Sequence, residues 1–491
     1  MQKIKQLAKD TIFYGVGSAA QKVIGLFMFP IYTRLLSKGE FGIQDLMSSA
    51  LAIISSVLIL GMDSGASRYY YDSEDGQAKK LVLSTWLWTQ LALTTLATAL
   101  LIIFAPALCG LLFKDASLSI YFRLAVANLP FIQFLAVAYL ALRLGFKSKT
   151  YSIVIVSGML IQALFCILFV TAFRWGILGV FYGQLIGNVV KFVIAVAVTR
   201  HAYAFALSKN LFKRILAFGV PFVPASVSLW LLNYSNRLFL VRSNSMEDIG
   251  ILSAAMRVGS IVAFAITAFR TAWGPFAFSI ANDRDLSRNT YSKVLTYYSM
   301  LISLAMVLLS VFAREIILIL ATSSYRSASS LVIYTCLSPT LWGATYIVGM
   351  GFQLEKKTYH VTVMTLIGAV ANIGLNFLLI PSMGVEGAAI ATLVGNFVTL
   401  LYSYFIGRRH MKLVFNARSL LFVSILMGMV VVAGRIADAA FFDWSMILLS
   451  LKVGLLMLFC AFSFFLNRKE WIGLGSNLKR EIFRRIIRVP R

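Results

Sequence analysis

The stretch Tyr151–Phe173 reads YSIVIVSGMLIQALFCILFVTAF and contains no charged residue. A helix of about 20 mostly apolar residues spans the hydrocarbon core of a bilayer. Because backbone in lipid must satisfy its own hydrogen bonds, this run predicts a transmembrane helix. Similar runs extend in both directions along the chain and predict an all-α integral membrane protein with about fourteen transmembrane helices. They cover residues 11–36, 42–67, 81–112, 119–142, 151–173, 177–199, 215–241, 250–280, 294–320, 328–352, 359–380, 387–407, 419–437 and 445–466.

The composition agrees with a membrane environment. Hydrophobic residues make up 59% of the 491 residues and charged residues 13%, against roughly 45–50% and about 25% in soluble domains. The polar, basic start Met1–Asp10 does not resemble a cleavable signal. Four cysteines lie in apolar stretches with no metal-site or disulfide spacing, so we expect no cofactor. They are Cys109, Cys166, Cys336 and Cys460.

Basic residues predict the orientation, because cytoplasmic loops carry the excess of Lys and Arg. With a cytoplasmic N-terminus, 30 basic residues fall in cytoplasmic connections and in the C-terminal tail, and only five fall on the outer side. This asymmetry predicts a multi-pass protein with both termini in the cytoplasm. It also accounts for most of the net charge of +26, so we expect no nucleic-acid partner. The five outer residues are Lys38, Lys114, Arg174, Arg242 and Arg326.

The chain matches itself at an offset of 208 residues, without gaps, over about 165 residues. Aligned apolar residues would mean little, but here loop residues and glycines align. Six predicted spans separate the copies, an even number, so both copies face the same way as in a parallel repeat. The matches include Arg34 with Arg242, Gly42 with Gly250, Lys149-Thr150-Tyr151 with Lys357-Thr358-Tyr359, Gly176 with Gly384, and Gly187-Asn188 with Gly395-Asn396.

The repeat predicts two six-helix lobes, residues 1–210 and 211–412, followed by an extra transmembrane pair over 413–466. Residues 467–491 alternate apolar and basic positions, which predicts an amphipathic cytoplasmic tail that contacts anionic membrane lipids. Transporters built from such repeats bind substrate near the midplane between them and alternate access. Transport is therefore the function class that this architecture favours.

Charged residues inside the predicted spans are mostly basic. A buried ion is costly unless it is paired or hydrated, so these residues should face the protein interior or a wet cavity. The excess of cations indicates an anionic substrate. The basic residues are Lys22, Arg34, Arg123, Lys191, Arg237, Arg257, Arg270, Arg314, Arg435 and Lys452, and the acidic ones are Asp45, Asp63 and Glu315.

Position within the spans selects the candidate cavity residues. Lys22 lies roughly 16 Å into its span, too deep for easy access to the interface, and Gln21 belongs to the polar stripe of the same helix. In span 215–241, Asn233 and Arg237 belong to a similar polar stripe. Span 250–280 adds two arginines, about 20 Å apart on an ideal helix, which could serve two cavity depths. These two are Arg257 and Arg270.

Asp63 is a weak candidate for coupling transport to an ion, only because acids are scarce in the spans.

The segment Tyr32–Gly42 (YTRLLSKGEFG) and the segment Gly61–Tyr70 (GMDSGASRYY) resemble the polysaccharide transporter family. This family includes the Wzx-type O-antigen flippases of lipopolysaccharide synthesis and belongs to the multidrug/oligosaccharidyl-lipid/polysaccharide exporter superfamily. The resemblance covers most of the chain. It implies a flippase of the bacterial inner (plasma) membrane that moves an undecaprenyl-pyrophosphate-linked oligosaccharide from the cytoplasmic to the outer leaflet by alternating access.

The resemblance also implies how this substrate is held. Lys and Arg in a cleft of low dielectric are natural partners of a pyrophosphate. Carried over to this chain, the basic residues of the cleft-lining helices are Lys22, Arg237, Arg257 and Arg270. The implied partners are the lipid-linked oligosaccharide itself, membrane lipids, and a polysaccharide polymerase with its chain-length proteins.

Other functions stay open at this point. A cation-coupled multidrug exporter of the same superfamily usually holds a carboxylate in its first helix, but residues 11–36 contain no acid. A membrane enzyme acting on lipid-linked sugars would need a catalytic cluster, and His201, His360 and His410 fall at cytoplasmic ends without one. We therefore expect a transporter rather than an enzyme or a non-transporting scaffold.

Overall fold

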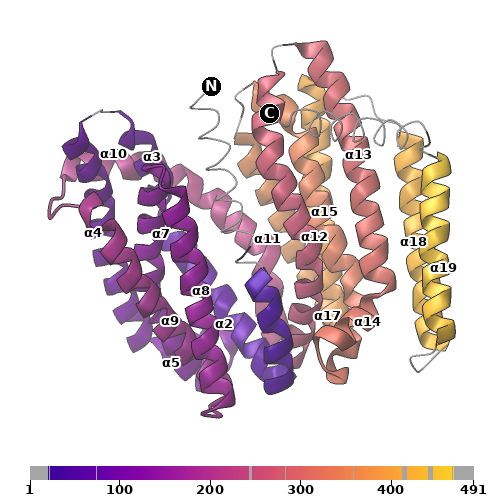
Figure 1. The fold of residues 1–491 in the computed structure, drawn as a ribbon, viewed down its shortest axis with the longest axis horizontal. Coiled ribbons are helices and arrows are strands. Elements are labelled where there is room, and N and C mark those ends of the chain that lie inside the picture. Colours follow the sequence, from indigo (N-terminus) through magenta and orange to yellow (C-terminus); the bar gives the residue numbers. More distant parts are fainter. Residues whose placement is uncertain are drawn as a thin grey trace, which may run out of the picture. The chain divides into compact units, whose positions relative to one another are not determined.

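The computed structural model describes residues 20, 23–72, 75–242, 246–281, 283–355, 357, 359–411, 417–440, 446–466 and 468. Every regular element in these ranges is a helix, which confirms the predicted all-α class (Figure 1). The candidates Gln21 and Lys22 lie outside the described residues, as does the predicted amphipathic tail apart from Arg468.

The helices follow the predicted spans closely. They are α2 (Lys38–Leu58), α3 (Met62–Tyr70), α4 (Gly76–Ile103), α5 (Ala105–Phe113), α6 (Ser119–Val126), α7 (Leu129–Leu144), α8 (Ser148–Thr171), α9 (Gly176–Thr199), α10 (Lys209–Gly219), α11 (Val223–Arg242), α12 (Met246–Ser279), α13 (Arg284–Val311), α14 (Ala313–Leu320), α15 (Val332–Val348), α16 (Met350–Leu354), α17 (Tyr359–His410), α18 (Ala417–Ala440) and α19 (Met446–Leu466).

The helices of membrane-spanning length fall on twelve of the fourteen predicted spans. In the described part of the chain, 11 helical segments are long and apolar enough to cross a membrane. One of them, the 52-residue α17, holds two predicted spans that meet at Gly384, whose backbone leaves the helical region at φ 55° and ψ −131°. The shorter apolar helix Val23–Leu35 and α18 supply the other two.

Helix boundaries recur at the offset that relates the two halves of the sequence, and we call two residues related by this offset repeat mates. α2 begins at Lys38 and α12 at its repeat mate Met246, while α4 begins at Gly76 and α13 at its repeat mate Arg284. The residues before α4 and α13, Asp75 and Asp283, are repeat mates as well. Both accept hydrogen bonds from the first-turn amides, which satisfies donors that a helix start leaves open.

A backbone turn repeats in the same way. The repeat mates Gly176 and Gly384 both have positive φ, at 53° and 55°. Glycine adopts this conformation without the steric cost that a Cβ would add. The two copies of the repeat therefore share a chain reversal as well as their helix starts.

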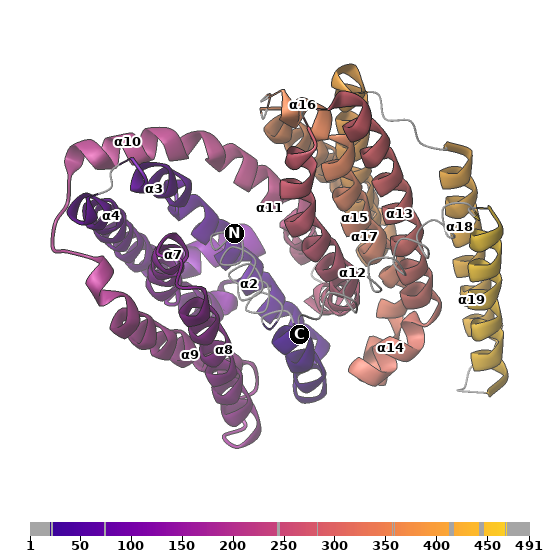
Figure 2. The same ribbon diagram turned by 45° about the horizontal axis from the view of Figure 1, so that its top comes forward.

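The chain divides into two compact units. Unit 1 comprises Met1–Ala254, Leu320–Ser324 and Thr365–Thr392, and unit 2 comprises Ala255–Ile319, Tyr325–Met364 and Leu393–Arg491. These units differ from the lobes that the repeat predicts, and the lobe boundary at residues 210 and 211 stays a prediction. Within unit 1, α10 packs along α3 (Figure 2).

Each unit has a core built from its own helices. In unit 1, Trp86 of α4, Phe134 of α7 and Ile215 of α10 belong to one buried apolar cluster. In unit 2, Val311 of α13 and Phe459 of α19 belong to another, and α18 and α19 run side by side (Figure 1).

Candidate functional site

One face of α2 contacts α11 and the start of α12, all within unit 1. Lys38, Gly42, Asp45 and Ser49 follow each other at steps of four, three and four, which places them on one side of the helix. Each contributes one contact to the neighbouring helices. We call this set the α2 contact face.

The contacts of this face combine charge with close backbone approach. Lys38 Nζ lies 2.7 Å from Glu247 Oε2. The Ser49 carbonyl accepts a hydrogen bond from Trp230 Nε1 at 2.8 Å. Between them, a Cβ added at Gly42 would lie only 2.0 Å from the Met246 carbonyl oxygen. Glycine at position 42 therefore permits α2 and α12 to meet.

The repeat makes this crossing symmetric. A Cβ added at Gly250, the repeat mate of Gly42, would lie 2.2 Å from the Lys38 carbonyl oxygen. Lys38 and Met246 are repeat mates in the same way. Each helix thus presents its glycine to the first residue of the other helix, as an axis relating the two copies requires.

Arg237 of α11 is buried at this face with only 2% of its surface exposed. Its Nε donates to Asp45 Oδ2 at 2.9 Å. Its Nη1 donates to the Asn233 carbonyl and to Asn236 Oδ1, both at 2.9 Å. A buried ion pair is tolerated only when further hydrogen bonds satisfy its charges, and Arg237 has them.

Asn233 takes part in this arrangement through its backbone. Its carbonyl oxygen accepts from Arg237, while its side-chain amide donates to the Leu229 carbonyl at 2.7 Å. The structure therefore brings together two of the predicted site residues, Arg237 and Asn233, with an acid, Asp45, that had no assigned role.

A buried amide network continues from Arg237, and the sequence reasoning missed it. Asn236 donates to Thr392 Oγ1 at 3.2 Å. Ser235 donates to Asn372 Oδ1 at 2.8 Å, and Asn376 donates to the same oxygen at 3.0 Å. The signal available in the sequence was three asparagines within apolar spans, Asn236, Asn372 and Asn376. The last two are spaced i, i+4 on one helix.

Arg257 and Arg270, both on α12 in unit 2, differ from Arg237. Arg257 is half-buried and Arg270 is exposed. Neither guanidinium has a hydrogen-bond acceptor or carboxylate partner within the described ranges. α12 runs unbroken from Met246 to Ser279, so the two arginines stay at separate depths.

Arg270 lies in an aromatic environment. Its guanidinium carbon sits 3.8 Å from the ring centroid of Tyr346, a cation–π contact. Trp273 donates to the Tyr346 carbonyl at 3.3 Å, and Phe269 stacks on Trp273 with centroids 5.8 Å apart. Trp342 packs edge-on against Tyr346 at 5.7 Å. The charge of Arg270 is thus held in place without being neutralised.

The other described cations of the predicted spans all have acceptors. Arg34 and Arg123 donate to backbone carbonyls of Pro30 and Ile102, and Lys191 donates to Gln162 Oε1 at 2.6 Å. Arg435 donates to the backbone carbonyl of Ser330, which also lies in unit 2. Among the described residues, Arg257 and Arg270 are therefore the span cations whose side chains donate no hydrogen bond within the protein.

A second buried ionic cluster lies in unit 2, where α14, α18 and α19 meet. Lys452, with 0% of its side chain exposed, pairs with Glu315 at 2.7 Å and with Asp438 at 2.8 Å. Arg314 approaches the same aspartate at 3.5 Å. Two cations and two anions balance here, so this cluster joins helices and offers no net charge to a substrate.

Asp63 lies half-buried in the first turn of α3. No described residue pairs with its carboxylate, because the nearby Arg68 pairs instead with Asp72 at 2.5 Å. Its coupling role stays a prediction. Within the described ranges, no group of three His, Cys, Asp or Glu residues is placed to hold a metal ion.

Comparison with known proteins identifies the family to which the chain belongs. The sequence model of a family described as "Polysaccharide biosynthesis protein" matches residues 31–330. Protein 1 of the Lsg locus of Haemophilus influenzae is 21% identical over 339 residues, which cover 68% of this chain and 81% of that protein.

Two solved structures of similar fold belong to transporters. The lipid II flippase MurJ, in an inward closed conformation, has a TM-score of 0.72 and 17% identity, covering 92% of this chain and 99% of that chain. A multidrug resistance MATE family transporter of the MOP superfamily, inward-facing, has a TM-score of 0.68 and 17% identity, covering 79% and 94%. At these identities the likeness shows the fold.

The family match covers more than half of the chain and confirms the resemblance that the segments Tyr32–Gly42 and Gly61–Tyr70 indicated. The protein is therefore a multi-span membrane member of the polysaccharide biosynthesis protein family, within the polysaccharide transporters, and it has the fold of the MOP superfamily.

Proposed function

We propose that the protein is a flippase that moves an undecaprenyl-pyrophosphate-linked oligosaccharide from the cytoplasmic to the outer leaflet of the inner membrane. Its family and its MurJ-like fold support this class of transport. The excess of basic over acidic residues in the predicted spans supports an anionic substrate. The polyprenyl tail would stay in lipid while the head group crosses through the protein.

The observation that carries this proposal is that neither Arg257 nor Arg270 donates a hydrogen bond to any residue in the described part of the chain. An arginine presents five donors in a planar fork that matches phosphate oxygens, so each can bind a pyrophosphate in a bidentate way. Trp342, which packs edge-on against the Tyr346 ring that Arg270 covers, adds an aromatic face on which the apolar faces of sugar rings can pack. Two arginines at two depths suit a substrate that moves between them.

The remaining candidates take supporting roles in this proposal. Lys22 and Gln21 extend the basic surface from the first span. Arg237 is held by Asp45, so it reaches the substrate only when α2 and α11 separate and the pyrophosphate replaces the carboxylate. Asn233 then orients Arg237 through its carbonyl group.

Translocation in proteoliposomes tests the proposal. A lipid-linked oligosaccharide is placed in one leaflet and its appearance in the other is followed for wild type, Arg257→Ala and Arg270→Ala. Loss of one charged hydrogen-bonding group costs about 1.5–3 kcal/mol, so each variant should flip roughly 10–100 times more slowly. Arg123→Ala is the matched control, since Arg123 is exposed and bonded to a backbone carbonyl.

The same vesicles separate this function from the multidrug-exporter alternative, which the likeness to a MATE transporter favours. Wild-type flipping that both Arg variants lose while Arg123→Ala keeps it would support the flippase. Efflux of an organic cation without flipping of the lipid-linked sugar would refute it.

A further inference from the structure

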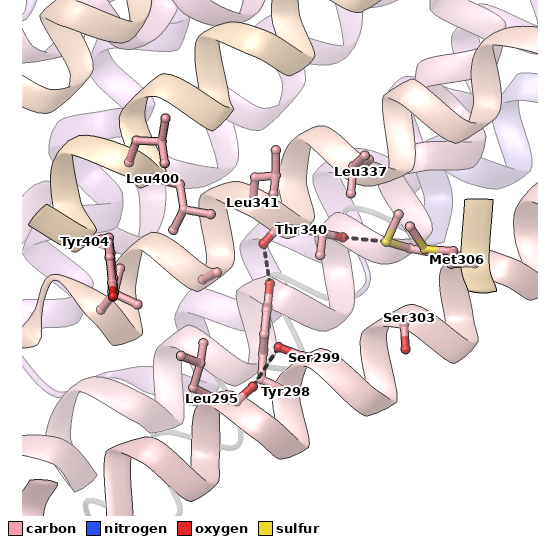
Figure 3. A pocket seen from close by; sticks show the side chains of 14 residues that line it. Leu295, Tyr298, Ser299, Ser303, Met306, Leu337, Thr340, Leu341, Leu400 and Tyr404 are labelled. Atoms are coloured by element: carbon pink, nitrogen blue, oxygen red, sulfur yellow. Dashed lines mark hydrogen bonds between the residues drawn. The ribbon is translucent and has the colours of Figure 1, made fainter. Parts of the chain in front are cut away.

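Unit 2 contains a cavity that the proposed transport function does not use. Its volume is about 320 Å³, within the range of ligand sites. α13, α15 and the second half of α17 line it (Figure 3). Met427 of α18 also belongs to the lining. None of its lining residues comes from α12, which carries Arg257 and Arg270.

The hydroxyl groups around this cavity already have hydrogen bonds within the protein. Tyr298 reaches across to donate to the Thr340 carbonyl at 2.8 Å (Figure 3). Ser299 donates to the Leu295 carbonyl at 2.8 Å. Ser303 and Thr340 also donate to carbonyls of their own helices. These groups leave little for a polar ligand to gain, so the cavity suits a hydrocarbon chain.

The acyl chains of the bilayer can supply such a hydrocarbon chain to the cavity. The same helices expose large apolar side chains beside the cavity, including Leu301 at 45%, Phe405 at 59% and Met429 at 62%. In a multi-span membrane protein such side chains face the acyl chains of the bilayer. A lipid chain can therefore pass from the bilayer into the cavity along an apolar surface.

Basic residues continue the cavity-lining faces toward one end of the helices. Arg288 lies seven residues before Leu295 on α13, and Arg408 lies seven residues after Leu401 on α17. Seven residues return to within about 20° of the same face and extend roughly 10 Å along the helix. Arg288 Nε is buried and has no hydrogen-bond partner among the described residues.

We propose that this cavity binds an anionic phospholipid, with one acyl chain among α13, α15 and α17 and the phosphate at Arg288 and Arg408. Both arginines lie at the helix ends that the basic residues of the sequence predict to be cytoplasmic, so the lipid belongs to the inner leaflet. An anionic headgroup matches two arginines, one of which lacks an acceptor for its Nε. A bound lipid of this kind stabilises unit 2 by mass action.

Photolabelling of the full-length protein tests the site. We would reconstitute it in nanodiscs with phosphatidylglycerol that carries a diazirine on the acyl chain, and map the labelled residues by peptide mass spectrometry. Labels should fall on the stretches around Met306, Thr340 and Tyr404. Unlabelled phosphatidylglycerol should compete, and phosphatidylcholine should compete about tenfold less well.

Two variants with matched controls separate the chain and headgroup contacts. Ala344→Phe fills the cavity and should remove the labelling, whereas Ala461→Phe on the exposed face of α19 should leave it unchanged. Arg288→Gln combined with Arg408→Gln should abolish the preference for phosphatidylglycerol. Arg409→Gln, one position away and exposed, should keep it.

Two results would overturn the proposal. Labels spread evenly over lipid-facing helices of the wild type, with no competition, would mean that the cavity holds no lipid. Competition by a polyprenyl phosphate but not by phosphatidylglycerol would assign the cavity to a substrate tail instead. The wild-type competition decides the question even when Ala344→Phe does not fold, and labelling needs no transport, so the result is independent of the flippase assay.

Discussion

At the scale of single residues, the pair formed by Asp45 and Arg237 has the clearest energetic consequence. Arg237 is 2% exposed, so removal of its carboxylate partner leaves a buried charge unpaired. Breaking a buried pair on one side costs about 3–5 kcal/mol. We expect Asp45→Asn to lower the thermal unfolding temperature of the purified protein strongly, as measured by tryptophan fluorescence in detergent.

Asp72→Asn is the matched control for this prediction. Asp72 pairs with Arg68, and the two side chains are 38% and 57% exposed. Exposed pairs contribute about 0–1 kcal/mol, so this variant should unfold close to the wild-type temperature. Similar losses in both variants would show that Arg237 does not depend on Asp45.

The sequence identified the charges of the spans but not their partners. Asp45 and Arg237 are 192 residues apart, and no spacing rule connects them. Arg34 and Arg123 are satisfied by backbone carbonyls, which every sequence offers. Whether an arginine lacks a hydrogen-bond acceptor, as Arg257 does among the described residues, therefore depends on tertiary packing that the chain alone does not reveal.

At the scale of helices, the crossing of α2 and α12 depends on glycine. A Cβ at Gly42 would lie 2.0 Å from the Met246 carbonyl oxygen, too close for any side chain. Overpacking of this kind costs about 1–3 kcal/mol. We expect Gly42→Ala to lower the unfolding temperature in the same fluorescence assay.

Gly39→Ala provides the control on the same helix. A Cβ at Gly39 meets nothing within 4 Å, and alanine favours a helix over glycine by roughly 1 kcal/mol. This variant should therefore be as stable as wild type or slightly more stable. If Gly42→Ala were equally stable, the two helices would not be in contact at their starts.

The ionic cluster of α14, α18 and α19 carries a second prediction at this scale. Lys452 holds both Glu315 and Asp438 with no exposed surface of its own. Lys452→Met leaves two acids with Arg314 alone, so we expect a loss of about 3–5 kcal/mol. The unfolding temperature measures this loss, with the exposed Lys293→Met as the control that should change little.

At the scale of the whole chain, the internal repeat predicted that helices begin at equivalent positions in its two copies. The helix starts at Lys38 and Met246, and at Gly76 and Arg284, are repeat mates, and the second pair shares its aspartate cap. The repeat alone did not predict every break inside a span. The span 81–112, for example, divides into α4 and α5, where Pro106 in the first turn of α5 starts a new helix.

The last prediction joins the α2 contact face to transport. Under the proposed alternating access, the beginnings of α2 and α12 must separate during each cycle. Lys38 and Glu247 lie 2.7 Å apart there, so cysteines at both positions can be joined by a short cleavable thiol cross-linker. We expect the cross-link to stop flipping in proteoliposomes and its cleavage to restore it, with the single-cysteine variants treated in the same way as controls. Undiminished flipping by fully cross-linked protein would mean that this contact stays closed throughout the cycle and that the substrate leaves by another path.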